Sequence, residues 1–257
     1  MSHGSESDGG WADHFSGQSS AYAEFRPTYP DALGEWLAMM APSPNCVWDC
    51  ATGNGQAATM LARHFTTVIA TDASEAQIAR AVPDDRITYR VASAYASGLP
   101  DTSCDVVTVA QAAHWFSLPE FYAEAARVLR PGGLLALWGY ARLESDNPPL
   151  DAVVHDFQYR ELAGWWPTGR ELVDDEYRSL AFPWARIQSP PFTMSVRWTR
   201  EQLLGYIASW SAVVRKHDAS GRDPLLDLAP RLRALWPDDH DVRAIRWPLF
   251  MHCARLR

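Results

Sequence analysis

Apolar and polar positions alternate between two spacings over residues 45 to 140. Short apolar runs rich in β-branched residues are typical of buried strands, and they are "CVWDC", "TTVIATD", "RITYRVA", "CDVVTVA" and "GLLALWGY". Between them lie stretches with apolar residues at helical spacing, namely "GQAATMLARHF", "SEAQIARAV" with Ser74 as its cap, and "LPEFYAEAARVLR". This alternation predicts an α/β fold with a doubly wound, mostly parallel sheet and helices on both faces.

The chain outside this region follows other patterns. Before it, "YPDALGEWLAMMAP" predicts a helix that prolines end. After Tyr140, "NPPLDAVVHDFQYRELAGWW" predicts a helix and "PPFTMSVRW" a strand. We expect "TREQLLGYIASWSAVVRKH" to form one long helix capped by Thr199, and "DPLLDLAPRLRALWP" to form a helix interrupted at Pro230. The final stretch, "VRAIRWPLFMHCARLR", predicts a strand pair or one bent strand.

Composition narrows the class of protein. The 257 residues are 47% hydrophobic, which is enough for a sizeable core, and the net charge of −8 argues against a broad nucleic-acid surface. No apolar run reaches the roughly 20 residues of a membrane span. Residues 1–10, "MSHGSESDGG", lack the basic flank and apolar core of a signal peptide and predict a disordered polar tail.

The cysteines indicate a reducing compartment. None of the four belongs to a Cys-x-x-Cys pair, so we expect buried free thiols rather than zinc ligands or disulfides; they are Cys46, Cys50, Cys104 and Cys253. We therefore expect a cytoplasmic protein. We expect no nucleic-acid or membrane partners, and the sequence leaves open whether the protein is a monomer or a homodimer. The histidines are scattered, and no metal-ligand spacing is visible.

Two acids and a glycine turn follow the first two strands. In a parallel sheet, ligands bind beyond the carboxyl ends of the strands. Gly53 and Gly55 follow the first strand, where glycine permits a tight turn and close approach of a ligand. Asp49 stands before this turn, where a carboxylate would repel a pyrophosphate and suit a cationic group. Asp72 ends the second strand, the place for an acid that accepts hydrogen bonds from ribose hydroxyls.

These residues therefore predict a nucleoside ligand that carries cationic groups instead of phosphates. Each of these residues could instead have a purely structural role. Asp72 alone could cap the next helix, Asp49 could form the turn, and the glycines could serve only to connect a strand with a helix.

S-adenosylmethionine has this chemical make-up: a ribose, an adenine, a sulfonium and an amino-acid end. The chain resembles the class I S-adenosylmethionine-dependent methyltransferases, of the methyltransferase type 11 group. Four stretches carry the resemblance: "VWDCATGNG", "VIATDAS", "CDVVTVAQAAHWF" and "RVLRPGGLLALW". Two more, "AYAEFRPTYP" and "AQAAHWF", are similar to the branch of small-molecule enzymes that includes trans-aconitate methyltransferase.

The resemblance implies a Rossmann-like sheet of seven strands with the last one antiparallel. "PPFTMSVRW" and the C-terminal stretch would be the sixth and seventh strands. It implies one methyltransferase domain over residues 11–257, with S-adenosylmethionine as cofactor and S-adenosylhomocysteine as product. The expected parts are a helical cap at 11–41, the cofactor-binding core at 45–140, a helical lid at 147–180, and strands and helices at 185–257 that complete the sheet.

The resemblance also implies a set of cofactor-binding residues. They are Tyr22, Arg26, Asp49, Ala51, Gly53, Asn54, Gly55, Asp72, Ala73, Ser93, Ala94, Tyr95 and Gln111. Ala51 replaces the family's first glycine, and its methyl group is tolerated if its φ angle is negative. The acid often found near the adenine amine is absent, so Ser93 and the backbone of Ala94 are expected there.

Two of these residues keep alternatives. Gln111 either caps the helix after the fourth strand or lies near the methionine end of the cofactor. Arg26 either makes a surface ion pair or binds a carboxylate of the cofactor or of the substrate.

The substrate side is expected to be aromatic. His114 either packs or faces the substrate, and Trp115 and Phe116 beside it predict an apolar wall, completed by Trp165 and Trp166. Of the 12 tryptophans, seven lie from Trp165 onward, and most of these seven are expected to pack in the interior. Aromatic faces also stabilise cations such as a sulfonium and keep water out.

We expect O-methylation of a carboxylate, which is ionised at neutral pH and needs no base. Methylation of a hydroxyl or amine would use His114 as the base, and the rate would rise through about pH 6.5. Two other functions stay open. "GNGQAA" also fits the Gly-x-Gly-x-x-Ala turn of a dinucleotide-dependent oxidoreductase, and the chain could bind S-adenosylmethionine without chemistry.

Overall fold

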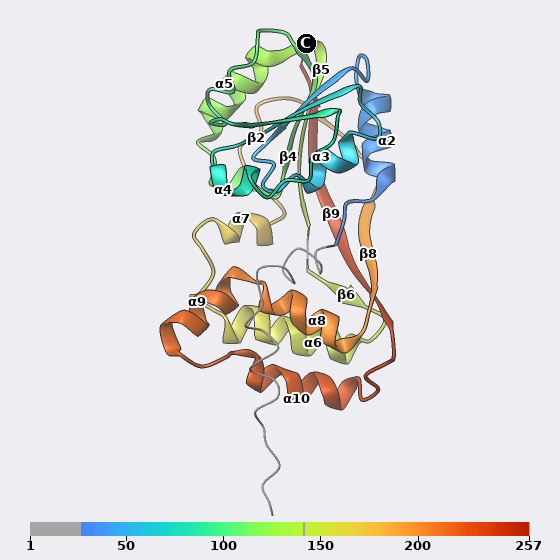
Figure 1. Cartoon of the computed structure of the whole chain (residues 1–257), viewed down its shortest axis with the longest axis vertical. Helices are drawn as coiled ribbons and strands as arrows, with labels where there is room; N and C mark the ends of the chain where they lie inside the picture. The colour runs from blue at the N-terminus through green and yellow to red at the C-terminus, as the bar shows by residue number, and fades with distance from the viewer. Residues whose placement is uncertain (1–26, 141, 257) are drawn as a thin grey trace, which may run out of the picture. The chain divides into compact units, whose positions relative to one another are not determined.

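A computed structural model describes residues 27–140 and 142–256. The predicted tail at 1–10, most of the predicted cap at 11–41, and the site residues Tyr22 and Arg26 lie outside the described residues. The chain divides into two compact units (Figure 1). The sheet unit comprises Thr28–Glu144, Pro167–Val196 and Ile245–Arg257; the helical unit comprises, among described residues, Pro27, Ser145–Trp166 and Arg197–Ala244. The predicted lid at 147–180 therefore contributes to both units, and its role stays a prediction.

The sheet unit is built on a mostly parallel sheet, as predicted. Five parallel strands run in the order β3-β2-β1-β4-β5: β1 (Cys46–Cys50), β2 (Thr67–Asp72), β3 (Ile87–Val91), β4 (Cys104–Ala110) and β5 (Leu129–Tyr140). The antiparallel strand β9 (Arg243–Arg255) pairs with β5 and with β8 (Phe192–Trp198). The C-terminal stretch is thus one strand that runs through Pro248. Two further strands of two residues each, β6 (Glu144–Ser145) and β7 (Arg186–Ile187), bring the total above the expected seven.

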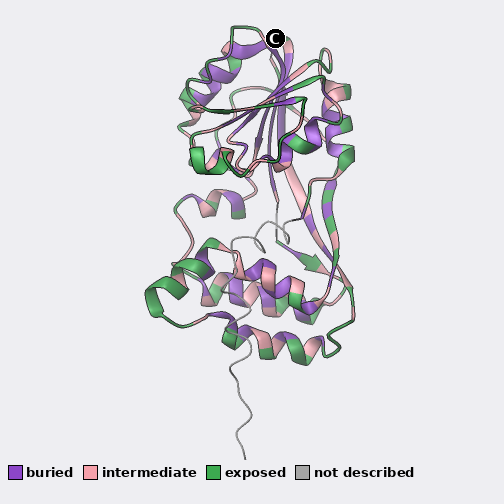
Figure 2. Cartoon of the chain, viewed as in Figure 1, coloured by how far each residue is buried: buried purple, intermediate pink, exposed green. Residues whose placement is uncertain are grey.

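Alternating side chains of the strands supply two buried layers, one on each face. Val47 belongs to the layer that packs against α2 (Asp31–Met40) and α3 (Gln56–Leu61), and its neighbour Trp48 belongs to the layer against α5 (Leu118–Val128). Figure 1 shows α2 and α5 on opposite sides of the sheet, and Figure 2 shows the strands between them as largely buried. Because successive side chains of a strand point to opposite faces of the sheet, each strand contributes to the core on both faces.

Two short helices end earlier than the apolar spacing predicts. α3 stops at Leu61 instead of continuing to Phe65, and α4 (Glu75–Ile78) is one turn long, although Ser74 caps it as predicted. In both places the chain tightens into i→i+3 hydrogen bonds, such as His64 N–H to Leu61 O at 2.9 Å. Such bonds commonly close the last turn of a helix. The sheet unit also contains η1 (Ala113–Trp115) and α7 (Arg170–Asp174).

The helical unit contains α6 (Pro148–Asp156), the π-helical turn η2 (Phe157–Glu161), α8 (Arg200–Ala208), α9 (Ser211–Ser220) and α10 (Leu225–Leu235). The single long helix expected after Thr199 is wrong, because Trp210 adopts an extended conformation between α8 and α9. Thr199 does cap α8, in a reciprocal capping box with Gln202. α10 continues through Pro230 without the expected interruption. None of the described helices has the length and apolar character needed to cross a membrane.

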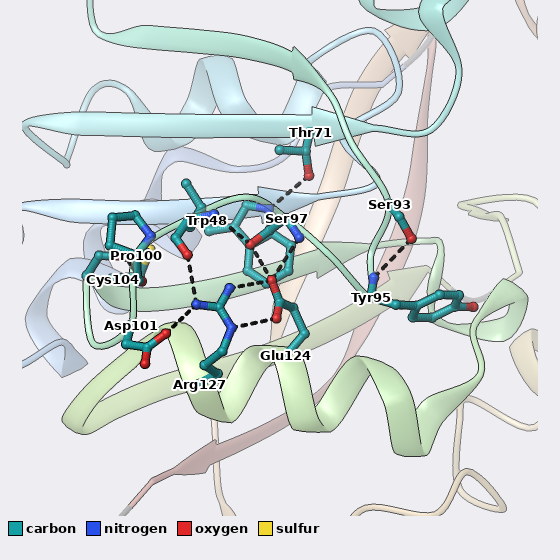
Figure 3. Close-up of polar contacts among 12 residues, drawn as sticks. Trp48, Thr71, Ser93, Tyr95, Ser97, Pro100, Asp101, Cys104, Glu124 and Arg127 are labelled. Atoms are coloured by element: carbon teal, nitrogen blue, oxygen red, sulfur yellow. Dashed lines mark hydrogen bonds and ion pairs between the residues drawn. The ribbon is translucent and has the colours of Figure 1, made fainter.

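An ionic cluster centred on the buried Glu124 holds the loop between β3 and β4 onto α5 (Figure 3). Glu124 Oε1 accepts hydrogen bonds from the backbone N–H of Ser97 at 2.8 Å and from its hydroxyl at 2.5 Å. Arg127 binds the same carboxylate at 2.7 and 2.8 Å and also donates to Leu99 O and Asp101. The Arg127 guanidinium and then the Ser97 bonds lower the pKa of Glu124 to about 2. The cluster fixes the loop that carries the predicted adenine-binding residues.

We expect Glu124→Gln to destabilise the protein by roughly 1.5 to 3 kcal/mol at neutral pH, since one charge-assisted contact is lost. The pKa of Glu124 is depressed from its ordinary 4.5, so its contribution is fully present above that value and is lost as the pH falls toward 2. Urea unfolding of wild type and variant between neutral and acidic pH measures this. Glu120→Gln, at an exposed position of the same helix, is the matched control. Equal urea midpoints for the two variants at neutral pH would contradict the role of Glu124.

Candidate functional site

The turn after β1 is left-handed at three positions. Ala51, Gly53 and Gly55 have φ angles of 55°, 59° and 89°. The negative φ that would make the Ala51 methyl group easy to accommodate is therefore not observed, and this alanine adopts a conformation that favours glycine. The turn is held by Thr52 N–H to Thr71 O at 2.9 Å and by Gly55 N–H to Thr52 O at 3.0 Å.

Glycine is required at positions 53 and 55 for different structural reasons. A Cβ atom on Gly53 would meet nothing within 4 Å, so the main chain is open to a ligand on that side. A Cβ atom on Gly55 would lie 2.4 Å from the hydroxyl oxygen of Tyr89. Gly55 thus lets the turn pack against β3, whereas Gly53 leaves room for close approach.

Asp72 connects the end of β2 to this turn. Its Oδ2 accepts a hydrogen bond from Gly53 N–H at 2.9 Å, and its Oδ1 accepts one from Ser74 N–H at 2.8 Å. The cap of α4 is Ser74, whose hydroxyl accepts from Gln77 N–H at 3.3 Å, so capping is not the role of Asp72. The carboxylate is half-buried, and each oxygen keeps a lone pair for a further donor.

Asp49 lies beneath the turn and is fully buried. Its oxygens accept hydrogen bonds from the hydroxyls of Thr52 at 2.5 Å and Thr108 at 2.8 Å, and the backbone of Ala58 donates a third. Burial raises the pKa of Asp49 to about 6, these three bonds oppose the rise, and the charge of Asp72 adds to it. Thr52 and Thr108 are residues that sequence reasoning missed; the acid–x–x–Thr spacing was the signal for Thr52.

The loop clamped by Glu124 carries Ser93, Ala94 and Tyr95. The Ser93 hydroxyl accepts from Tyr95 N–H at 3.2 Å (Figure 3). The Tyr95 hydroxyl accepts from Ser117 N–H at 2.7 Å, and its ring contacts Phe116 edge-on at 6.4 Å. Tyr95 thereby joins this loop to the segment after β4.

Gln111, at the end of β4, has a left-handed φ of 56°. Its Oε1 accepts a hydrogen bond from Tyr140 N–H at 2.9 Å, which ties the end of β4 to the end of β5. The alternative that Gln111 caps the following helix is wrong. Of the other predicted residues, Asn54 is half-buried in the turn and Ala73 is exposed after β2.

His114 lies in η1, directly after β4, and is half-buried. Its Nδ1 lies 2.9 Å from the hydroxyl of Tyr177, and its ring lies 4.7 Å from that of Trp115. Burial lowers the pKa of His114 to about 4, the positive charge of Arg170 lowers it further, and Glu171 opposes the shift. The imidazole is therefore neutral at neutral pH.

The four predicted aromatic residues fall in different units. Trp115 is 56% exposed, and the ring of Phe116 packs against Phe121 at 4.9 Å, both in the sheet unit. Trp165 and Trp166 belong to the helical unit, where the Trp166 indole donates to Gln158 O at 2.9 Å. The common wall proposed for these four residues stays a prediction.

Comparison with known proteins gives consistent results. A family model described as a methyltransferase domain matches residues 48–137. A putative methyltransferase of Dictyostelium discoideum is 34% identical over 93% of each chain, and an uncharacterized methyltransferase of Mycobacterium tuberculosis is 34% identical over 94% of each. The solved structure of a putative type II methyltransferase from Anaeromyxobacter dehalogenans is 43% identical, covers 90% of this chain and 97% of its own, and superposes with a TM-score of 0.84.

The stability of the protein should depend on pH through the buried carboxyl group of Asp49. Its pKa is raised from an ordinary 3.8 to about 6, so ionisation in the folded protein removes stability as the pH rises through that interval. Asp49→Asn should therefore gain roughly 2 to 3 kcal/mol relative to wild type between about pH 4 and 7. Urea unfolding of the ligand-free protein across this range measures the difference. Asp85→Asn, at an exposed position, should follow wild type, and parallel curves for Asp49→Asn and wild type would contradict the assignment.

Proposed function

We propose that this chain, which belongs to the class I S-adenosylmethionine-dependent methyltransferases, transfers the methyl group to a carboxylate oxygen of a small-molecule acceptor. Membership of this family identifies S-adenosylmethionine as the cofactor and rules out the alternative of a dinucleotide-dependent oxidoreductase. The choice of a carboxylate rests on one observation: His114, the base candidate found in the sequence, is held neutral with a pKa of about 4.

The residues at the ends of β1 and β2 fit S-adenosylmethionine. When bound, this cofactor supplies an electrophilic methyl group on a sulfonium. Gly53 would let it approach the main chain, which is open there. The half-buried carboxylate of Asp72 would accept from the ribose hydroxyls with its remaining lone pairs. Asp49 would favour the cationic end of the cofactor through Thr52, whose hydroxyl lies between this carboxylate and the turn.

The segment after β4 favours an anionic acceptor. A general base works best when its pKa lies near the working pH, so a pKa of about 4 makes His114 a weak base. A carboxylate needs no base, because it is already ionised at neutral pH. Arg170 lies close enough to affect the pKa of His114, although it also pairs with Asp174 at 2.9 Å. Its positive charge, which Glu171 partly offsets, would suit an anion here, a role first predicted for Arg26.

The ribose role of Asp72 is tested by Asp72→Asn, which keeps one acceptor oxygen for the turn. Loss of charge-assisted hydrogen bonds, each worth roughly 1.5 to 3 kcal/mol, should lower the affinity for S-adenosylhomocysteine at least about tenfold. Isothermal titration calorimetry measures the affinity, and circular dichroism checks the fold. The exposed Asp85→Asn should bind as wild type does. Unchanged affinity in a folded Asp72→Asn would rule out this role.

The acceptor class is tested by the stability of the labelled product in alkali. The rise through about pH 6.5 expected for a His114 base is no longer diagnostic, because an imidazole with a pKa of about 4 is deprotonated throughout the range of about pH 6 to 9. With donor labelled in its methyl group, we expect turnover of small carboxylic acids but not of the matched alcohols and amines. Alkali should release labelled methanol from the resulting ester, and an alkali-stable product would overturn the proposal.

The role of His114 is tested separately with the acceptor found. For a carboxylate, His114→Gln should lower kcat by much less than the roughly hundredfold expected on removal of a general base. The exposed His240→Gln, in the helical unit, serves as a control for histidine replacement. A hundredfold loss of kcat in His114→Gln would restore the hydroxyl or amine alternative.

A further inference from the structure

Two consecutive residues other than glycine adopt the left-handed conformation next to His114. Glu176 and Tyr177 have φ angles of 56° and 58°. They follow α7, and the residue before α7 also packs on this histidine: a Cβ atom on Gly169 would lie 3.0 Å from His114 O and 3.5 Å from its Cδ2. Strained backbone of this kind persists only where the surroundings enforce it, and it gathers at functional sites.

Strand β9 and α7 enforce the conformation of this pair. The carbonyl of Glu176 accepts a hydrogen bond from His252 Nε2 at 2.8 Å, and Tyr177 N–H donates to Leu172 O at 2.8 Å. The Tyr177 ring is fully buried and meets Phe250 edge-on at 5.0 Å. The contacts of Glu176 and Tyr177 with β9 and α7 therefore fix the position of the Tyr177 hydroxyl.

The hydrogen bonds of this hydroxyl determine where its proton points. Tyr177 is fully buried, and within the described part of the chain His114 Nδ1 is the one group that forms a hydrogen bond with its hydroxyl. Burial raises the pKa of Tyr177, so the phenol keeps its proton. The distance to His114 Nδ1 is 2.9 Å, and the O–H group donates to it, because a buried hydroxyl that only accepted here would leave its own proton without a partner. A neutral imidazole that accepts at Nδ1 carries its own proton on Nε2.

We propose that Tyr177 is a positioning residue that fixes His114 as the Nε2–H tautomer, so that this histidine offers the acceptor a hydrogen-bond donor instead of a base. Within the described part of the chain, no residue accepts a hydrogen bond from Nε2. The half-buried ring therefore has its Nε2–H group available to a ligand. The identity of that ligand as a carboxylate rests on the proposed function, whereas the tautomer is a property of the chain alone.

The donor has a defined part in carboxylate methylation. One carboxylate oxygen forms a bond to the methyl carbon while the carbon–sulfur bond breaks, and that electron pair stays on sulfur. Nε2–H donates to the other oxygen and orients the group for in-line attack. No proton moves in this step, so His114 keeps the same tautomer before and after transfer.

Nuclear magnetic resonance of the full chain with ¹⁵N-labelled histidine tests the tautomer directly. Long-range ¹H–¹⁵N correlations at neutral pH should show His114 with an unprotonated Nδ1 and a protonated Nε2, without any ligand. His114→Gln identifies the resonances. A wild-type spectrum with the proton on Nδ1 would overturn the proposal, whether or not any variant folds.

Tyr177→Phe tests the cause of the tautomer. Phenylalanine keeps the ring and its edge contact with Phe250 but removes the hydroxyl, so the single-tautomer pattern of His114 should change to a mixture. Tyr122→Phe is the matched control, because the Tyr122 hydroxyl donates to Ala181 O at 2.7 Å in the same unit and has no contact with His114. Retention of the Nε2–H pattern in Tyr177→Phe would show that the hydroxyl is not responsible.

Experiment can distinguish a failure of carboxylate methylation from a failure of the positioning role of Tyr177. A spectrum with the expected tautomer, combined with an alkali-stable methylated product, would overturn carboxylate methylation and keep the role of Tyr177. An ester product combined with an Nδ1–H tautomer would do the reverse. With a carboxylate acceptor, Tyr177→Phe should raise KM about two- to fivefold and change kcat less, because only a fraction of the His114 side chains would present Nε2–H to the acceptor.

Discussion

The buried carboxylate of Asp49 is the interaction on which the ligand-binding edge of the sheet depends. It connects the turn after β1 through Thr52, strand β4 through Thr108, and helix α3 through Ala58. These bonds do not fully replace the lost hydration, since the pKa of Asp49 stays raised at about 6. The ligand-free protein therefore holds an under-compensated negative charge at neutral pH. With the proposed role of Asp49, a cofactor that carries a sulfonium and an ammonium group would relieve this cost, and the loss of stability would become affinity for the cation.

Strand order explains why these groups meet. β1 lies between β2 and β4. The chain runs from β1 to β2 and β3 on one side and then crosses to β4 and β5 on the other side, and open α/β sheets bind ligands at such a point. Left-handed residues other than glycine follow both strands at this point, Ala51 after β1 and Gln111 after β4. Gln111 uses its side chain to hold β5, and Asp72 uses one oxygen to hold Gly53 N–H. The edge is thus ordered by its own hydrogen bonds before a ligand arrives.

Sequence reasoning reached the strands and the first acids because their signals are local. β1 and β4 were predicted with their observed bounds, since an apolar run of that length between turn residues has few alternatives. The φ of Ala51 was missed, because an alanine gives no sign of a left-handed conformation that the surroundings impose. The contact of His114 with Tyr177 joins residues 63 apart in sequence, and no local pattern connects them. The break between α8 and α9 was hidden for a related reason, since apolar spacing continues through Trp210 although the backbone does not. The narrower resemblance to the trans-aconitate branch stays a prediction.

Opposite charges at the two parts of this edge have a consequence for catalysis. Carboxylates lie under the turn after β1 and at the end of β2, whereas the segment after β4 offers Nε2–H of His114 near Arg170. A cationic donor and an anionic acceptor would each be stabilised before reaction, but transfer between them cancels both charges. Groups that stabilise the separate charges therefore help binding and product release more than they lower the barrier. The acceleration must then come from holding acceptor oxygen, methyl carbon and sulfur in line at near-contact distance. The left-handed backbone of Gln111 and Tyr177 fits that requirement, because their side chains hold Tyr140 N–H and His114 in fixed positions.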